Sequence, residues 1–282
     1  MNTSTVIFCS DVHLCQVDHY DYPAQSRMEN LIEKLNAFYE QSPYEQIIFL
    51  GDYSLDHWGW CDGGSLSYGL CNTRQFIDRY AVKLKAPYHM APGNHELYGN
   101  EKWKEITGEE RNFCLTVGGY LVICCDNFAG ELDPVNPSDG IYSPTNLQFV
   151  KQKLSEYPDL PVILCSHYFD LQKEPDSFYS FIKNEKRITL LICGHDHLME
   201  ITDLGEAADH VCLYHDGHYS FTGGNKSLSD IMWGFCQVKL TPSGIDIRYI
   251  EPENHIHTDK FSIEHAYREQ CYRFFPRRDI NA

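Results

Sequence analysis

The segment ITLLICGHDH at residues 188–197 joins a short apolar run to two histidines that flank an aspartate. The run at 188–193 has the length and the aliphatic composition of a strand that is buried on both faces. Gly194 then lets the backbone turn sharply, and the spacing of His195 and His197 places both imidazoles on one side of an extended segment. The segment therefore predicts a buried strand whose carboxyl end carries two candidate ligands.

Four apolar runs earlier in the chain end in the same way. Each reads as a buried strand, and each is followed closely by side chains of the types that bind metal ions. In an open α/β sheet, ligands bind in the crevice beyond the carboxyl ends of the strands, so we expect these side chains to meet in one cleft. The runs and the residues that follow them are 6–9 with Asp11 and His13, 47–50 with Asp52, 87–90 with Asn94, His95 and Glu96, and 162–165 with His167.

Segments with a helical period separate these runs. Apolar residues recur at helical spacing over 28–39 and 76–84, and a shorter helix is expected after Asp176. Ser143 and Pro144 form a capping residue and first-turn proline that predict the start of another helix. This alternation of strands and helices predicts an α/β fold in which helices cover a largely parallel sheet.

Two regions depart from the alternation. The runs 113–117 and 120–125, joined by two glycines, predict an antiparallel hairpin, and after residue 198 the pattern consists mostly of strands. These later strands predict a second sheet packed on the first. No linker is visible, so we expect one domain over 1–250, followed by a C-terminal tail at 251–282 whose role the sequence does not indicate. The later strands are expected at 211–214, 218–221, 233–240 and 245–250.

Composition narrows the classes of partner. The chain of 282 residues carries 40 acidic and 23 basic residues, a formal net charge of -17, so duplex nucleic acid is not an expected partner. The sequence shows neither the core of a signal peptide nor an apolar run of about 20 residues, so we expect a cytoplasmic protein without a membrane partner. Most of the 12 cysteines lie in apolar runs and no CxxC pair occurs, which favours reduced, structural thiols.

The candidate ligands are imidazoles, carboxylates and one amide. These nitrogen and oxygen donors suit hard or borderline divalent cations, and the absence of a thiolate argues against a structural zinc site. The five motifs, in this order over residues 6 to about 200, resemble those of the calcineurin-like metallophosphoesterase superfamily. The hairpin at 113–125 also resembles the one that follows the GNH motif in that family.

The resemblance implies a fold of two packed β-sheets, largely parallel or mixed, flanked by helices in a metallophosphoesterase-like β-sandwich. It also implies two divalent metal ions, with manganese preferred and iron, zinc or nickel as alternatives. Asp52 would bridge the ions, and His95 would assist the chemistry without binding metal. The first ion would be held by Asp11, His13 and His197, and the second by Asn94, His167 and His195.

Such a centre would cleave phosphate monoesters or diesters with a hydroxide shared between the ions. Serine/threonine protein phosphatases share the GNHE found at 93–96, but they carry a glycine after the first Asp-x-His and an Asp-Arg-Gly in the second motif. Here Leu14 and Tyr53 stand at those places, so a small-molecule phosphodiesterase-like branch and a small or nucleotide-like substrate are favoured. The alternatives are a protein phosphatase and a non-catalytic metal-binding scaffold of the same fold. The oligomeric state is open.

Several residues outside the motifs have a structural and a functional interpretation. Trp58 and Trp60, among glycines after Asp52, either pack on the core or contact the organic part of the substrate. Asp56 is expected to be a solvated loop carboxylate. Glu96 and Asp196 are candidates for orienting ligand imidazoles. The histidines without a motif are expected to have surface or hydrogen-bonded roles, and these are His57, His89, His210, His215 and His218.

Overall fold

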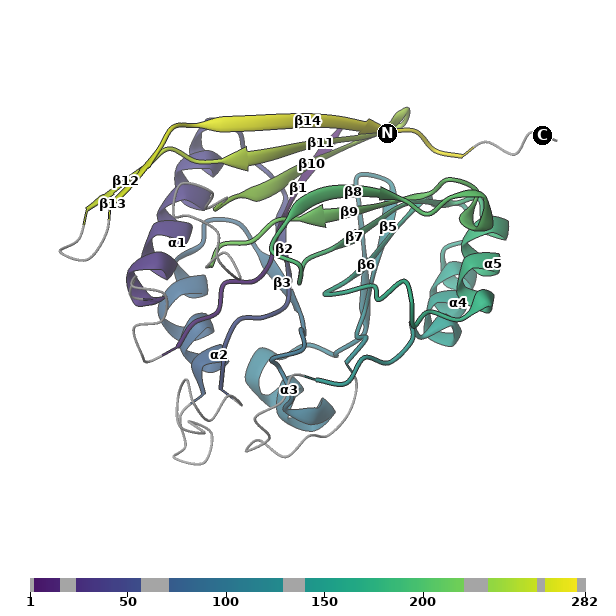
Figure 1. The fold of residues 1–282 in the computed structure, drawn as a ribbon, viewed down its shortest axis with the longest axis horizontal. Coiled ribbons are helices and arrows are strands. Elements are labelled where there is room, and N and C mark those ends of the chain that lie inside the picture. Colours follow the sequence, from purple (N-terminus) through teal and green to yellow (C-terminus); the bar gives the residue numbers. More distant parts are fainter. Residues whose placement is uncertain are drawn as a thin grey trace.

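The computed structural model describes residues 3–15, 24–56, 71–128, 140–220, 233–257 and 262–277. Within them, two six-stranded sheets face each other and helices cover their outer sides (Figure 1). The first sheet has the order β14-β11-β10-β1-β2-β3. Its strands are β1 (Ser4–Cys9), β2 (Gln46–Leu50), β3 (Tyr88–Ala91), β10 (Phe235–Thr241), β11 (Gly244–Glu251) and β14 (Arg268–Phe274).

The second sheet has the order β4-β5-β6-β7-β9-β8. Neighbours from β5 to β9 run parallel, whereas β4 and β8 pair antiparallel at the two edges. A separate hairpin is formed by β12 (Asn254–His257) and β13 (Ser262–His265). The strands of the second sheet are β4 (Phe113–Val117), β5 (Tyr120–Cys125), β6 (Val162–Ser166), β7 (Ile188–Cys193), β8 (Met199–Asp203) and β9 (Cys212–Asp216).

Alternation along each strand divides the core into three layers. In β1, Val6 and Phe8 point between the two sheets, while Ile7 and Cys9 point toward α1 (Ala24–Gln41). In the second sheet, Leu164 of β6 likewise faces α4 (Leu147–Glu156) and α5 (Asp176–Asn184). Strands buried on both faces explain why the sequence shows continuous apolar runs. The remaining helical segments are α2 (Asn72–Gln75), η2 (Phe76–Tyr80), η3 (Ala81–Lys83), α3 (Gly99–Thr107) and η4 (Glu206–Ala208).

Two packed sheets flanked by helices confirm the predicted fold class, but the division of strands between them differs from the expectation. The runs predicted to form one largely parallel sheet are split, with β1, β2 and β3 in the first sheet and β6 and β7 in the second. The later strands also go to both sheets, because β9 pairs with β7 while β10 pairs antiparallel with β1. A strand that is buried on both faces shows no sequence signal for its neighbour, so the pattern predicts the strands and not their pairing.

Two element boundaries are corrected as well. The helix expected from Ser143 begins at Leu147 instead, because the Asn146 side chain accepts the backbone N–H of Phe149 and caps it. Of the strand expected at 218–221, residues 218–220 are described, and only His218 makes a bridge, to Trp233.

The described part of the 251–282 segment is connected to the first sheet. β14 pairs with β11 over seven residues, from Ile245↔Phe274 to Glu251↔Arg268. Among the described helices, none is both long enough and apolar enough to cross a bilayer.

Candidate metal centre

The candidate ligands lie at the carboxyl ends of strands from both sheets. Asp11 and His13 follow β1, Asp52 follows β2, and Asn94 follows β3, all in the first sheet. From the second sheet, β6 contributes His167, and β7 contributes His195 and His197. Because the two sheets face each other, their loops bring these side chains together, although the chain separates them by up to 186 positions, from 11 to 197.

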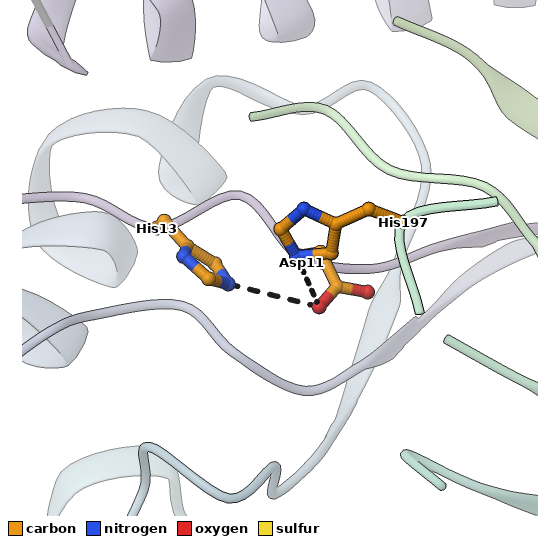
Figure 2. A group of neighbouring side chains, drawn as sticks. All are labelled: Asp11, His13 and His197. Carbon is orange, nitrogen blue, oxygen red and sulfur yellow. Dashed lines mark ion pairs between the residues drawn. The ribbon is translucent and has the colours of Figure 1, made fainter. Parts of the chain in front are cut away.

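The first group consists of Asp11, His13 and His197 (Figure 2). Nε2 of His197 lies 3.2 Å from Oδ1 of Asp11, and Nε2 of His13 lies 3.6 Å from the same oxygen. Figure 2 shows both imidazoles turned toward this carboxylate. Asp11 and His13 are buried, and His197 is nearly so. Three donor atoms therefore converge on one small volume.

The second group surrounds the amide oxygen of Asn94. Oδ1 of Asn94 lies 2.9 Å from both Nε2 of His167 and Nδ1 of His195, and these two nitrogens are 3.2 Å apart. The Asp52 carboxylate lies between the two groups, because its Oδ2 is 3.2 Å from Nε2 of His167 and 3.4 Å from Nε2 of His13. One carboxylate is thus within reach of both ligand sets.

These distances fit shared divalent cations. Nitrogen and oxygen ligands lie about 2.0–2.2 Å from such ions, so neighbouring ligand atoms in octahedral or tetrahedral geometry are about 2.8–3.6 Å apart. The separations given above lie between 2.9 and 3.6 Å. Nδ1 of His167 is 2.7 Å from the Leu50 carbonyl oxygen. That oxygen can only accept, so a neutral ring keeps the Nε2 lone pair for a cation.

Backbone strain is concentrated at the same positions. Left-handed φ angles cost a non-glycine residue about 1–2 kcal/mol each, and such strain gathers at functional sites. Seven described non-glycine residues have positive φ, and five of them are candidate ligands. Asp tolerates this region better than most residues, so the residue types suit the loops as well as the metal. The five are Asp11 (54°), His13 (49°), Asp52 (58°), His195 (73°) and His197 (53°).

Two glycines make room for the ligands. A Cβ on Gly93 would overlap the carboxylate of Asp52, and one on Gly194 would overlap Ser10 and crowd Asp11. The glycine in each motif is therefore required by close approach to a neighbouring motif.

His95 and Glu96 both act on Asp52, in different ways. The backbone N–H of His95 donates to Oδ1 of Asp52 at 3.0 Å, and its Nε2 lies 3.6 Å from Oδ2. The Glu96 carboxylate accepts backbone N–H groups of Asp52 (2.7 Å), Gly93 (2.9 Å) and Tyr53 (2.9 Å). The expectation that Glu96 orients a ligand imidazole is therefore wrong, because this carboxylate holds the loops that carry Asp52 and Asn94.

Two other carboxylates also differ from expectation. Asp56 is buried, not solvated, and accepts the backbone N–H of Asn72 (2.8 Å) and the hydroxyl of Tyr98 (2.7 Å). Asp196 lies 3.3 Å from Nδ1 of His215, which is not a candidate ligand. All three contacts are with residues distant in sequence, so the local pattern could not show them.

Two buried neighbours of the first group were not among the predicted site residues. The ring of His218 stacks on that of His197, with centroids 5.0 Å apart and an interplanar angle of 11°.

Oγ of Ser10 lies 2.5 Å from Oδ2 of Asp11 and 2.6 Å from Oδ1 of Asp216. Burial raises the pKa of Asp216 well above its ordinary value. Asp216 is the last residue of β9, and this position at a strand end is the sequence feature that could have indicated a place near the site.

The motifs, their order and their convergence can now be compared with known proteins. The sequence profile of the calcineurin-like phosphoesterases matches residues 4–199. The chain belongs to the calcineurin-like phosphoesterase family. A comparison with curated proteins finds no match. Family membership and the clustered candidate ligands together support a metal-dependent phosphoesterase.

Solved structures share the fold of this calcineurin-like phosphoesterase at low identity. PhoD superposes with a TM-score of 0.59 at 11% identity, covering 97% of this chain and 70% of PhoD. GAP50, described as the anchor in the inner membrane complex of Plasmodium, gives 0.57 at 13%, covering 99% and 91%. The purple acid phosphatase PPD1 from yellow lupin seeds gives 0.54 at 12%, covering 93% and 53%. One of these names denotes a phosphatase and another an anchor, so the fold alone does not establish catalysis.

The electrostatics of the centre predict that metal binding releases protons. Burial lowers the pKa of His167, but the carboxylates of Asp52 and Asp11 outweigh burial and raise it to about 10. The metal-free ring is therefore protonated at pH 7, and a cation must displace that proton. Burial and the His167 charge lower the pKa of His195, so this ring is neutral at pH 7 and releases no proton when a cation binds.

We expect metal binding to release at least about one proton per chain at pH 7. The number of protons released should fall as the pH rises through about 10. Calorimetric titration with Mn²⁺ in two buffers of different ionisation enthalpy measures this number. The exposed His210, whose pKa Asp203 raises, provides a control, because His210→Ala should leave proton release unchanged. Release of no proton at pH 7 would contradict the predicted charge of His167.

Proposed function

We propose that this calcineurin-like phosphoesterase hydrolyses small phosphate esters with two divalent metal ions, for which manganese is the preferred metal. The observation that carries the proposal is the position of Asp52, whose carboxylate is within 3.2–3.4 Å of imidazoles from both ligand groups. One shared carboxylate reduces the repulsion between two cations about 3.5–4 Å apart. Asp11, His13 and His197 would hold one ion, and Asn94, His167 and His195 the other.

The ions, when bound, would supply an activated water as nucleophile and stabilise the negative charge that develops on the phosphoryl oxygens. The protein's own contribution is geometry. Glu96 fixes the loop of Asp52 through backbone N–H groups, and Arg27 donates to the carbonyl oxygen of His13 at 2.8 Å. These contacts hold the ligand loops in their strained conformations before a cation arrives.

His95 would donate a proton to the leaving oxygen. The ring of His95 is buried beside Asp52, and its centroid lies 5.1 Å from that of His13. It is therefore close to the ligand set, and it is the candidate site histidine that belongs to neither of the two proposed ligand sets. General acid–base help of this kind requires a proton donor within reach of the leaving group.

Tyr53 supports a small substrate over a phosphoprotein. In protein phosphatases an arginine follows the bridging aspartate, whereas Tyr53 is fully buried here and its hydroxyl lies 2.8 Å from the Ala91 carbonyl oxygen. That position presents no cation to a phosphoryl group. A small or nucleotide-like monoester or diester needs fewer contacts beyond the metal pair.

We propose that Trp58 and Trp60, which lie outside the described residues, contact the organic part of such a substrate. Base stacking on an aromatic ring contributes about 1–3 kcal/mol, or one to two decades in affinity. Replacing both tryptophans with alanine should raise KM for a nucleotide-like ester while leaving a small generic ester nearly unchanged. Equal kinetics of the double variant and the wild type on both substrates would exclude this contact.

A substrate screen tests the proposed function. Purified protein, stripped of metal and reloaded with Mn²⁺, is assayed against p-nitrophenyl phosphate, bis(p-nitrophenyl) phosphate, nucleotide esters and a phosphopeptide. We expect metal-dependent turnover of at least one small ester and little turnover of the phosphopeptide. Metal binding without turnover of any ester would favour the scaffold alternative, and preferential turnover of the phosphopeptide would favour a protein phosphatase.

A further inference from the structure

The outermost strand of the first sheet, β14, has a strand neighbour on only one side within the described part of the chain. Figure 1 shows it along the top, beyond β11. Five of its seven residues are exposed, and large exposed apolar side chains flank it, Tyr267 at 51% and Phe275 at 65%. An exposed strand edge presents unpaired N–H and C=O groups that can pair with another chain. This edge is therefore a candidate interface.

The sequence of β14 and its flanking residues is complementary to that of a second, identical strand that runs antiparallel to it. Counting outward from Cys271, each residue before it matches the chemistry of the residue equally far after it. An antiparallel pair of identical strands centred on Cys271 would place these residues directly opposite each other, where side chains interact. The facing pairs are Gln270 with Tyr272, Glu269 with Arg273, Arg268 with Phe274 and Tyr267 with Phe275. In that arrangement they would form a polar pair, an ion pair, a cation–π pair and an aromatic pair.

The charges continue this complementarity across the sheet. The register of β14 on β11 places Arg273 beside Asp246 and Cys271 beside Arg248. Arg273 is 3.3 Å from Asp246, and Glu269 is 3.3 Å from Arg248. Pairing of Glu269 with Arg273 of a second copy would extend these contacts into a row of alternating charge. Each group keeps its partner within the chain and gains one of opposite sign.

We propose that two copies of this chain associate through β14, antiparallel, with a twofold axis at Cys271. A twofold axis perpendicular to the sheet keeps each face of the sheet continuous. It joins the first sheet of one copy to the first sheet of the other in a single sheet. Of this register and the two adjacent ones, only the register centred on Cys271 places Glu269 opposite Arg273. A centre at Gln270 would set Glu269 opposite Cys271, and a centre at Tyr272 would set it opposite Phe275. The interface includes none of the candidate metal ligands, so the proposal does not depend on the proposed function.

A charge placed on the axis tests the interface. In Cys271→Glu, the new carboxylate would lie beside Arg248 within the chain but directly opposite its own copy across the axis. The fold should therefore persist while the dimer dissociates. In the matched control Cys271→Ser, a neutral side chain should leave the dimer intact. Light scattering or sedimentation from micromolar to millimolar protein should give twice 32.7 kDa for wild type and control, and 32.7 kDa for Cys271→Glu.

Covalent trapping gives a second readout. Directly opposite residues of antiparallel strands have Cα atoms about 4.5–5.5 Å apart, within the range of a disulfide. Mild oxidation should cross-link the wild type into a dimer, and Cys271→Ser should abolish this cross-link. Melting curves of both variants verify the fold. A monomeric wild type throughout the concentration range would overturn the proposal, as would a dimer that survives in folded Cys271→Glu.

Discussion

The Asp52→Asn variant is expected to lose both metal ions and to fall in turnover by about 10³-fold or more, beyond the 10²–10³ typical of losing one electrostatic contact. The substitution removes the negative charge that both cations share, so both ligand sets should weaken together. Asparagine tolerates the left-handed φ of 58° at this position. Its oxygen can still accept the N–H of His95, so the loop should keep its shape.

The comparison variant is His13→Ala, which removes a ligand proposed for one ion only. We expect it to lose part of its metal and less activity than Asp52→Asn. Metal content and turnover of both variants are measured in parallel, with melting temperature as a check on the fold. An equal or smaller loss at Asp52 than at His13 would count against a bridging role.

The His95→Ala variant is expected to retain its metal and to slow by about 10²–10⁴, the usual range for general acid–base help. The slowing should be greatest for esters with poor leaving groups and mild for nitrophenyl esters, because nitrophenolate needs little protonation. A plot of turnover against the pKa of the leaving group measures this difference. Exposed His210→Ala serves as the control and should match the wild type throughout.

Two outcomes would assign His95 another role. If all leaving groups slow equally, His95 does not donate the proton. If the variant loses an ion, His95 is a ligand, as its grouping with His13 and Asp52 would also permit.

The sequence predicted the cluster of candidate ligands because each candidate stands directly after a recognisable strand. Strand ends of one open sheet converge, and here they also converge across two sheets because the sheets pack face to face. This is why Asp11, Asp52 and His195 could be placed in one cleft although β1 and β2 belong to one sheet and β7 to the other.

The surroundings of the cluster could not be predicted from local pattern. The sequence makes Glu96 a candidate for orienting a ligand imidazole, but its carboxylate accepts backbone N–H groups of residues more than 40 positions earlier. His218 had no motif, and its place beside His197 depends on how the chain returns after β9. Such contacts arise from tertiary packing, which residue periodicity does not encode.

The centre itself is tested most directly by anomalous scattering from crystals of the wild-type protein loaded with Mn²⁺. We predict two peaks about 3.5–4 Å apart, one among Asp11, His13 and His197 and the other among Asn94, His167 and His195, with Asp52 in contact with both. A single peak, or metal bound through cysteine sulfur, would contradict the dinuclear centre.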